Sequence, residues 1–349
     1  MKQRITLKFI AEKAGVNLAT VSRAINPATA SLISEKVRKD IQKICDEYGY
    51  RPSLRGRSIV TGKTFKIGMI LGDMQKDFSA HDWARIICNL SSELQRHNYA
   101  LTMLHADGTE SMDMQVKNFL MSGIADGYVT GPSMLGNEVF TLLQKLDVPL
   151  WAVCSTRNKI DSINCIIRDD IPALVEVWKN APPECRSKSA FFAHGSSENL
   201  PRISDIEKAA GIAYPDQNYK TEKIFFERPS TFSAMEYRDA LKAAVAAVDE
   251  IKKYKLIWCE SDFTAHALCD VLEMNNIRVG EDIHVIGYGN FETYTSSTEA
   301  PKISTISANA EKIGIELGKA LIAGINGRNT PETVINSIFI SRKTLLINQ

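Results

Sequence analysis

Apolar residues follow two different periods along this chain. Up to about residue 50 they recur every three or four positions, and from residue 65 onward short apolar runs alternate with helical stretches. Alternating strands and helices are typical of parallel sheets covered by helices on both faces. Ten strands are predicted, at residues 65–71, 100–106, 127–130, 149–154, 163–168, 189–194, 223–226, 256–261, 284–289 and 303–307. This number favours two doubly wound sheets, with a ligand cleft between two α/β lobes.

The stretch 6–26 predicts two short helices joined by a tight turn. Thr6 can cap the first helix, Gly15 ends it, and Asn17 can cap the second. A third helix follows over residues 34–50. Two short helices around a glycine turn are typical of a helix-turn-helix, whose second helix enters the major groove of DNA. The alternative is a pair of amphipathic helices that simply pack within a larger α/β domain.

The distribution of charge favours the DNA-binding interpretation. Residues 1–63 hold thirteen Lys or Arg against five Asp or Glu, a net charge of +8. The remaining residues hold 29 basic against 36 acidic side chains, a net charge of −7, so the total of +1 conceals a basic head and an acidic body. A basic head on an acidic body is what a phosphate-binding module on a soluble sensor would look like.

Several other classes of protein are disfavoured by the sequence. No apolar run approaches the roughly 18 residues of a membrane span, and the first residues lack the apolar core of a signal peptide, so we expect a cytoplasmic protein. Seven scattered cysteines without a CxxC pair indicate reduced thiols. The GKT at 62–64 lacks the spacing of a phosphate loop, the HGSS at 194–197 is not GxSxG, and the histidines lack metal-ligand spacing. We therefore expect no enzyme activity, no cofactor and no metal.

Six motifs in this order resemble one known family. They read AGVNLATVSRAIN, EYGYRPS, TGKTFKIGMIL, GIADGYV, WCESDFTAHAL and VGEDIHVIGYGN. Together they resemble the lactose-repressor and galactose-repressor family of bacterial transcription regulators over nearly the whole chain. The resemblance implies a dimer whose core resembles a periplasmic binding protein. It implies a headpiece at 1–50, a hinge helix at 51–64, and a core at 65–349 with lobes at 65–167 plus 291–324 and 168–290 plus 325–345.

The same resemblance implies a set of DNA contacts from the headpiece and the hinge. These are Thr6, Asn17, Leu18, Ala19, Thr20, Ser22, Arg23, Asn26, Arg55 and Ile59. The guanidinium fork of Arg23 suits guanine, whereas Leu18 and Ala19 offer only apolar contacts, for example to thymine methyl groups. Ile59 stands where the family has a leucine that wedges into the minor groove, and Gly56 replaces a usual alanine. An ordinary flexible linker is the alternative for the hinge.

The resemblance also implies a small-molecule effector, often a sugar, between the lobes. The matching positions are Asp73, Phe78, Asp169, Arg202, Ser261, Asp262 and Asn290. Three departures from the family stand out, because Ser261 replaces a usual asparagine, Gly289 a usual aspartate, and Cys154-Ser155 a usual Asp-Arg pair. The effector is thus expected to be a sugar or sugar derivative, and a non-sugar effector or none stays open.

We therefore expect a DNA-binding transcriptional regulator, a repressor in its simplest form, that binds a palindromic operator as a homodimer. The last residues show no added heptad segment that would form a tetramer. The rival interpretations are a solute-binding protein without a regulatory role and a Rossmann-type enzyme, which would need a cofactor loop that the sequence lacks.

Overall fold

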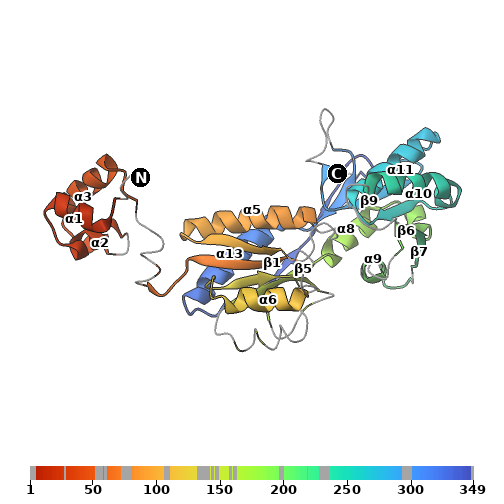
Figure 1. The fold of residues 1–349 in the computed structure, drawn as a ribbon. Coiled ribbons are helices and arrows are strands. Elements are labelled where there is room, and N and C mark those ends of the chain that lie inside the picture. The colour runs from red at the N-terminus through yellow and green to blue at the C-terminus, as the bar shows by residue number, and fades with distance from the viewer. Residues whose placement is uncertain are drawn as a thin grey trace. The chain divides into compact units, whose positions relative to one another are not determined.

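The computed structural model contains two compact units, Met1–Phe65 and Lys66–Gln349 (Figure 1). The residues that it describes are 5–26, 29–51, 58, 61–71, 80–105, 111–131, 142, 145, 149–156, 159, 163–195, 200–217, 219–227, 236–292 and 301–346. Each unit has its own hydrophobic core, so the two are considered separately.

The first unit is built on three short helices. They are α1 (Leu7–Ala14), α2 (Leu18–Ile25) and α3 (Glu35–Glu47), with a 3₁₀ turn at Ala30–Leu32. Their apolar faces meet in a core of Ile10, Ala11, Val21, Ala24, Ile41, Cys45 and Tyr50. This is the packing that the helical period in the sequence predicted.

Side-chain caps set the lengths of these helices. The Thr6 hydroxyl accepts a hydrogen bond from the Phe9 amide at 3.2 Å, and the Asn17 side chain accepts one from the Thr20 amide at 2.7 Å. Gly15 ends α1 at a φ of 63°, in the left-handed region that glycine adopts without a steric cost. Both predicted caps and the glycine turn are confirmed. Ser34 precedes α3 as expected, but its side chain makes no capping hydrogen bond.

The second unit contains two six-stranded sheets. The first has the order β11-β5-β4-β3-β1-β2 with parallel pairing throughout, and the second has the order β12-β10-β9-β8-β6-β7, in which only β12 is antiparallel to its neighbour. The strands are β1 (Lys66–Leu71), β2 (Ala100–His105), β3 (Tyr128–Thr130), β4 (Leu150–Ser155), β5 (Asn164–Asp169), β6 (Ser189–His194), β7 (Thr221–Phe226), β8 (Leu256–Cys259), β9 (His284–Tyr288), β10 (Ser304–Ser307), β11 (Thr333–Asn336) and β12 (Ile338–Ile340). All ten predicted strands are confirmed, and β11 and β12 were missed.

Helices cover both faces of each sheet. In the first lobe, α5 packs along α13 on one face, and α6 covers the other (Figure 1). In the second lobe, α8 and α9 share one core with the sheet, and α10 and α11 share another. The bounds are α5 (Ala80–Arg96), α6 (Met112–Met121), α8 (Ile171–Asn180), α9 (Leu200–Ala213), α10 (Glu236–Ile251), α11 (Asp262–Met274) and α13 (Ala310–Ile325). The predicted doubly wound architecture with two lobes is confirmed.

The points at which the chain changes lobe differ from those we expected. The first crossing follows β5, close to the predicted boundary after residue 167. The segment 291–324 was assigned entirely to the first lobe, but β10 within it pairs with β9 of the second sheet. The segment 325–345 was assigned entirely to the second lobe, but β11 within it pairs with β5 of the first. These assignments were wrong because strand pairing, which the apolar pattern does not reveal, decides to which sheet a strand belongs.

The close approach of α13 to α5 gives a test of this packing. A Cβ added at Gly314 would lie 2.5 Å from the Ile86 carbonyl oxygen, so Gly314→Ala should push the helices apart and destabilise the core by about 1–3 kcal/mol. Gly211 in α9 is the matched control, because no heavy atom lies within 4 Å of an added Cβ. Gly211→Ala should stabilise by roughly 0.5–1 kcal/mol through helix propensity. Denaturant unfolding measures both, and equal shifts would contradict this packing.

Candidate functional site

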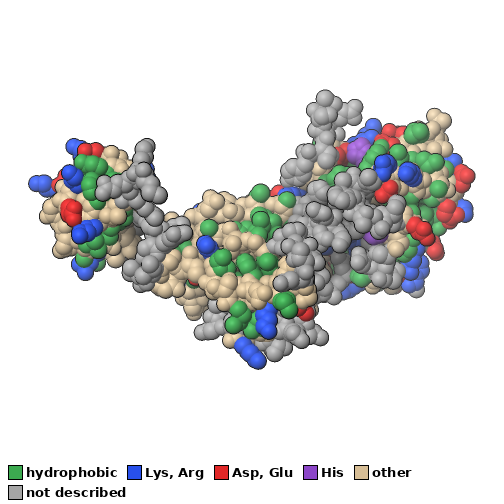
Figure 2. Space-filling model, in the orientation of Figure 1, with side chains coloured by type: hydrophobic (Ala, Val, Ile, Leu, Met, Phe, Trp, Pro, Cys, Tyr) green, Lys and Arg blue, Asp and Glu red, His purple; other side chains and the backbone are tan. Residues whose placement is uncertain are grey.

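Helix α2 presents one face to solvent and buries the other. Val21 and Ala24 face the core, whereas Ala19, Ser22 and Arg23 are exposed. Leu18, in the first turn of the helix, is 49% exposed. Leu18 therefore lies on the exposed side of α2 together with these three residues. In Figure 2, Lys and Arg side chains lie at several places on the visible face of this unit.

Some of the predicted DNA contacts are also structural. The side chains of Thr6 and Asn17 cap helices, and the Thr20 hydroxyl donates a hydrogen bond to the Asn17 side-chain oxygen at 2.9 Å. Asn26 lies exposed just after α2. The hinge residues Arg55 and Ile59 lie outside the described residues. The roles of all these residues on DNA stay predictions.

In the second unit, a cavity of about 90 Å³ lies between the two lobes, near the carboxyl ends of strands. Its lining consists of Asp82, Arg168, Asp170, Arg202, Glu260, Ser261, Tyr288, Gly289, Phe291, Ile306 and Ala308. Ligands of open α/β sheets bind at this edge because the loops there leave a crevice. Among the predicted effector residues, Arg202 and Ser261 line the cavity, and Asp73 and Phe78 lie outside the described residues.

The other predicted effector residues make structural hydrogen bonds. Asp169 accepts one from the Ile171 amide at 3.0 Å at the start of α8. Asn290 accepts one from the Arg342 guanidinium. Their side chains therefore support the lobes, and an additional effector contact by either one stays a prediction.

Asp262 fastens the turn that follows β9. Its carboxylate accepts hydrogen bonds from the Phe291 amide and the Thr305 hydroxyl, both at 2.6 Å, and the residue is 2% exposed. Burial raises the pKa of Asp262 to about 7, against the opposing effect of these two hydrogen bonds. Asp262 thus holds the cavity-lining residue Phe291 through its amide and does not line the cavity itself.

Sequence reasoning missed a charged cluster at the bottom of the cleft. Arg168 donates to Asp170 at 3.3 Å, and its guanidinium lies 3.9 Å from the carboxylate of Asp82. Within the described part of the chain, Asp82 Oδ1 is buried without a hydrogen-bond partner. Burial raises the pKa of Asp82 to about 6, although Arg168 opposes this shift. The RDD sequence directly after an apolar strand was the available signal for Arg168 and Asp170, whereas no local pattern marked Asp82.

Arg202 is held in place by several contacts. It donates to the Glu260 carbonyl oxygen at 2.6 Å, and its guanidinium lies 4.8 Å from the ring centre of Tyr288. The Glu260 carboxylate accepts a hydrogen bond from the His194 amide at 3.2 Å and contacts the His194 ring. A fixed arginine of this kind can bind a ligand with little loss of side-chain entropy.

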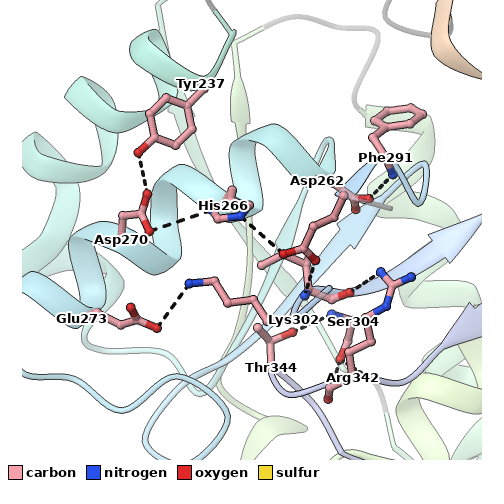
Figure 3. A network of polar contacts seen from close by, with 12 residues as sticks. Tyr237, Asp262, His266, Asp270, Glu273, Phe291, Lys302, Ser304, Arg342 and Thr344 are labelled. Carbon is pink, nitrogen blue, oxygen red and sulfur yellow. Dashed lines mark hydrogen bonds and ion pairs between the residues drawn. The ribbon is translucent and has the colours of Figure 1, made fainter. Parts of the chain in front are cut away.

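A second polar network lies behind this wall (Figure 3). Glu292 accepts a hydrogen bond from the Ile303 amide at 2.7 Å and lies 3.4 Å from the ring nitrogen of His266. The hydrogen bond to Glu292 raises the pKa of His266. Lys302 pairs with Glu273 at 3.8 Å. The network joins α11 to the chain on both sides of the segment 293–300, and we interpret it as structural.

A larger hollow, of about 420 Å³, lies at the C-terminal end of α11. Two of its cations, Arg278 and Lys302, are already paired with acidic side chains. The smaller cavity between the lobes is therefore the better ligand site, because it combines a buried carboxylate oxygen without a partner with residues from both lobes.

The described residues show neither a membrane-spanning helix nor a metal-binding cluster. None of the described helices combines the length and the apolar composition that crossing a bilayer requires. His, Cys, Asp and Glu side chains in the described ranges form no group of three that would hold a metal ion.

Parts of both units match models of known families. Residues 6–53 match the model of "Bacterial regulatory proteins, lacI family", and residues 187–345 match that of "Periplasmic binding protein-like domain". The chain thus carries a lacI-type helix-turn-helix domain and a domain like those of periplasmic binding proteins. The HTH-type transcriptional regulator RegA of Clostridium saccharobutylicum is 25% identical over 350 residues, which cover 98% of this chain and 99% of RegA.

Solved structures of lacI-family regulators share the fold of this chain. The lac repressor dimer bound to operator and the anti-inducer ONPF matches 99% of the chain and 100% of its own, with a TM-score of 0.69 and 19% identity. The transcriptional regulator CelR in complex with cellobiose matches 98% of the chain and 100% of its own, with a TM-score of 0.60 and 19% identity. At this identity the likeness concerns the fold.

The raised pKa of Asp262 predicts how stability changes with pH. The folded value of about 7 lies above the usual aspartate value of roughly 3.9, so folded protein keeps a proton that unfolded protein releases between these two pH values. Stability should therefore fall as pH rises from about 4 to about 7. Asp262→Asn removes this contribution. The free energy of unfolding should then fall less between pH 4 and pH 7, by a few kcal/mol at roughly 1.4 kcal/mol per pKa unit.

Unfolding in denaturant at several pH values measures this difference. Asp82, whose pKa of about 6 contributes in the same direction, is present in both proteins and so cancels. Parallel pH profiles for the two proteins would contradict a protonated Asp262.

Proposed function

We propose that this protein is a transcriptional regulator, and in its simplest form a repressor, that binds a palindromic DNA site as a homodimer. One observation carries the proposal: α2 buries Val21 and Ala24 while exposing Leu18, Ala19, Ser22 and Arg23 along its other side. A helix in the major groove reads base edges with such a face. The Asn17 cap fixes the start of this helix, where Leu18 and Ala19 lie.

We further propose that a small molecule between the lobes controls DNA binding. The cleft combines the buried cluster around Arg168 with the fixed Arg202. Control requires the effector to prefer one arrangement of the lobes, and a preference of roughly 1–3 kcal/mol changes DNA affinity about 5–150-fold. A sugar or sugar derivative is the class expected from the sequence, and the CelR relative carries cellobiose. The cytoplasm, where the DNA target lies, is the expected location.

The test is binding of the full chain to a palindromic fragment selected from random sequences. The logarithm of the binding constant should fall linearly with the logarithm of salt concentration, because each phosphate contact releases condensed counterions. No affinity at low salt, or affinity independent of salt, would contradict a DNA-binding role.

Replacing Arg23 separates base reading from phosphate binding. Arg23→Ala should weaken binding to the selected site by about 1–3 kcal/mol if the guanidinium reads a guanine. Arg23→Lys is the matched control, because lysine keeps the positive charge but lacks the bidentate hydrogen bonding of the guanidinium group. It should retain the salt dependence while losing preference at one base pair. Unchanged site preference in both variants would reassign Arg23 to backbone contacts.

A further inference from the structure

Arg85 joins the two lobes beside the second crossing of the chain, which lies between β10 and α13. From α5 of the first lobe, its guanidinium donates to the Gly289 carbonyl oxygen of the second lobe at 3.2 Å and pairs with Glu311 at 2.8 Å. Glu311 lies in the first turn of α13, directly after the crossing. Because the Arg85 side chain is only 12% exposed, solvent and salt screen this bridge weakly.

Both ends of the bridge are rigid within their own lobes. In the first lobe α5 and α13 pack closely, since a Cβ added at Gly314 would lie 2.5 Å from the Ile86 carbonyl oxygen. In the second lobe the Gly289 amide donates to the Ile306 carbonyl oxygen at 2.9 Å, which fastens the turn after β9 to β10. A rotation of the lobes that moves Gly289 about 1 Å away from α5 therefore breaks its hydrogen bond with Arg85.

The backbone at this crossing has the conformation expected of a hinge. Asn309, the residue before α13, has a φ of 55° and a ψ of 43°, in the left-handed region that residues other than glycine seldom adopt. Asparagine tolerates this region better than most residues, and backbone strain of this kind is typical of switch regions. Hinges are often residues at the ends of helices or strands, where a change of φ and ψ turns one domain against another. The lobes can thus turn at Asn309, and Arg85 bridges this point.

We infer that Arg85 is a conformational clamp, which holds the lobes in the arrangement of this structure and must release Gly289 when the lobes turn. The inference rests on the proposed control of DNA binding by the lobes and adds the residue that sets the balance between two arrangements. Glu311 positions the clamp, because its Oε1 accepts hydrogen bonds from Arg85 Nε at 3.3 Å and from a terminal nitrogen at 2.8 Å. A hydrogen bond from a charged donor stabilises more than a neutral one, so the clamp favours the bridged arrangement about tenfold.

The distance between two spin labels on the full chain measures the lobe arrangement. Cys88 is exposed and the other six cysteines are buried, so Cys88→Ser leaves no exposed thiol. Labels are then attached at Met114→Cys on α6 of the first lobe and at Val245→Cys on α10 of the second, where the native side chains are 53% and 56% exposed. Labelled chains are diluted with unlabelled ones, so that only distances within one chain contribute.

Two variants release the clamp to different degrees. Arg85→Gln should shift the ratio of the two lobe arrangements about tenfold towards the unbridged one. Glu311→Gln should shift the ratio in the same direction by less, because Arg85 keeps its charge and its bond to Gly289. Glu311→Gln also carries the test if Arg85→Gln fails to fold. Arg96→Gln is the matched control, because this arginine lies on the same helix and its ion pair with Glu93 at 3.0 Å stays within α5.

An unchanged distance distribution in Arg85→Gln and Glu311→Gln, or an equal change in Arg96→Gln, would overturn the inference. The affinity of each variant for the selected DNA fragment is measured alongside. Arg85→Gln and Glu311→Gln should change this affinity in the same direction, whereas Arg96→Gln should leave it unaltered. Shifted distances with unchanged DNA affinity would defeat the proposed control by the lobes and support the clamp, so the two failures are distinguishable.

Discussion

A buried carboxylate holds together two of the three passages of the chain between the lobes. Asp170, at the first crossing, pairs with Arg168 and accepts a hydrogen bond from the Ser337 hydroxyl, at the third crossing, at 2.6 Å. The Ser337 amide adds a hydrogen bond to the Asp169 carbonyl oxygen at 2.8 Å. Because a buried charge is tolerated only when it is paired and hydrogen-bonded, these contacts fix the two passages side by side.

The cleft depends on this arrangement. Parallel strands bring their carboxyl ends to one edge of each sheet, and the tied crossings make the two edges face each other. Short connections between lobes are where rotation takes place when a ligand enters. Arg168 pairs with Asp170 at the first crossing and also lines the cavity. A ligand beside Asp82 therefore contacts a side chain that helps to hold the crossings together.

The small first unit reaches a defined structure by other means. Among its described residues, seven apolar side chains are buried in a small core, and capping by Thr6 and Asn17 and the glycine turn add to its order. The exposed face of α2 has a related cause, because a helix of eight residues in a small core needs only one side for packing. What remains on the other side is free for recognition.

The sequence by itself determined the headpiece helices with their caps, ten of the strands and the doubly wound class, because these follow from local periods and capping residues. It also marked Arg202 and Ser261 at the cleft. Only the tertiary structure decided that β10 and β11 belong to opposite sheets, since strand pairing is a long-range choice. The same holds for Asp262, whose sequence context resembles that of a ligand-binding residue but whose carboxylate is taken up by Phe291 and Thr305. Asp82 and Phe291 became cleft residues only through packing, because no local pattern records which side chains two distant segments bring together.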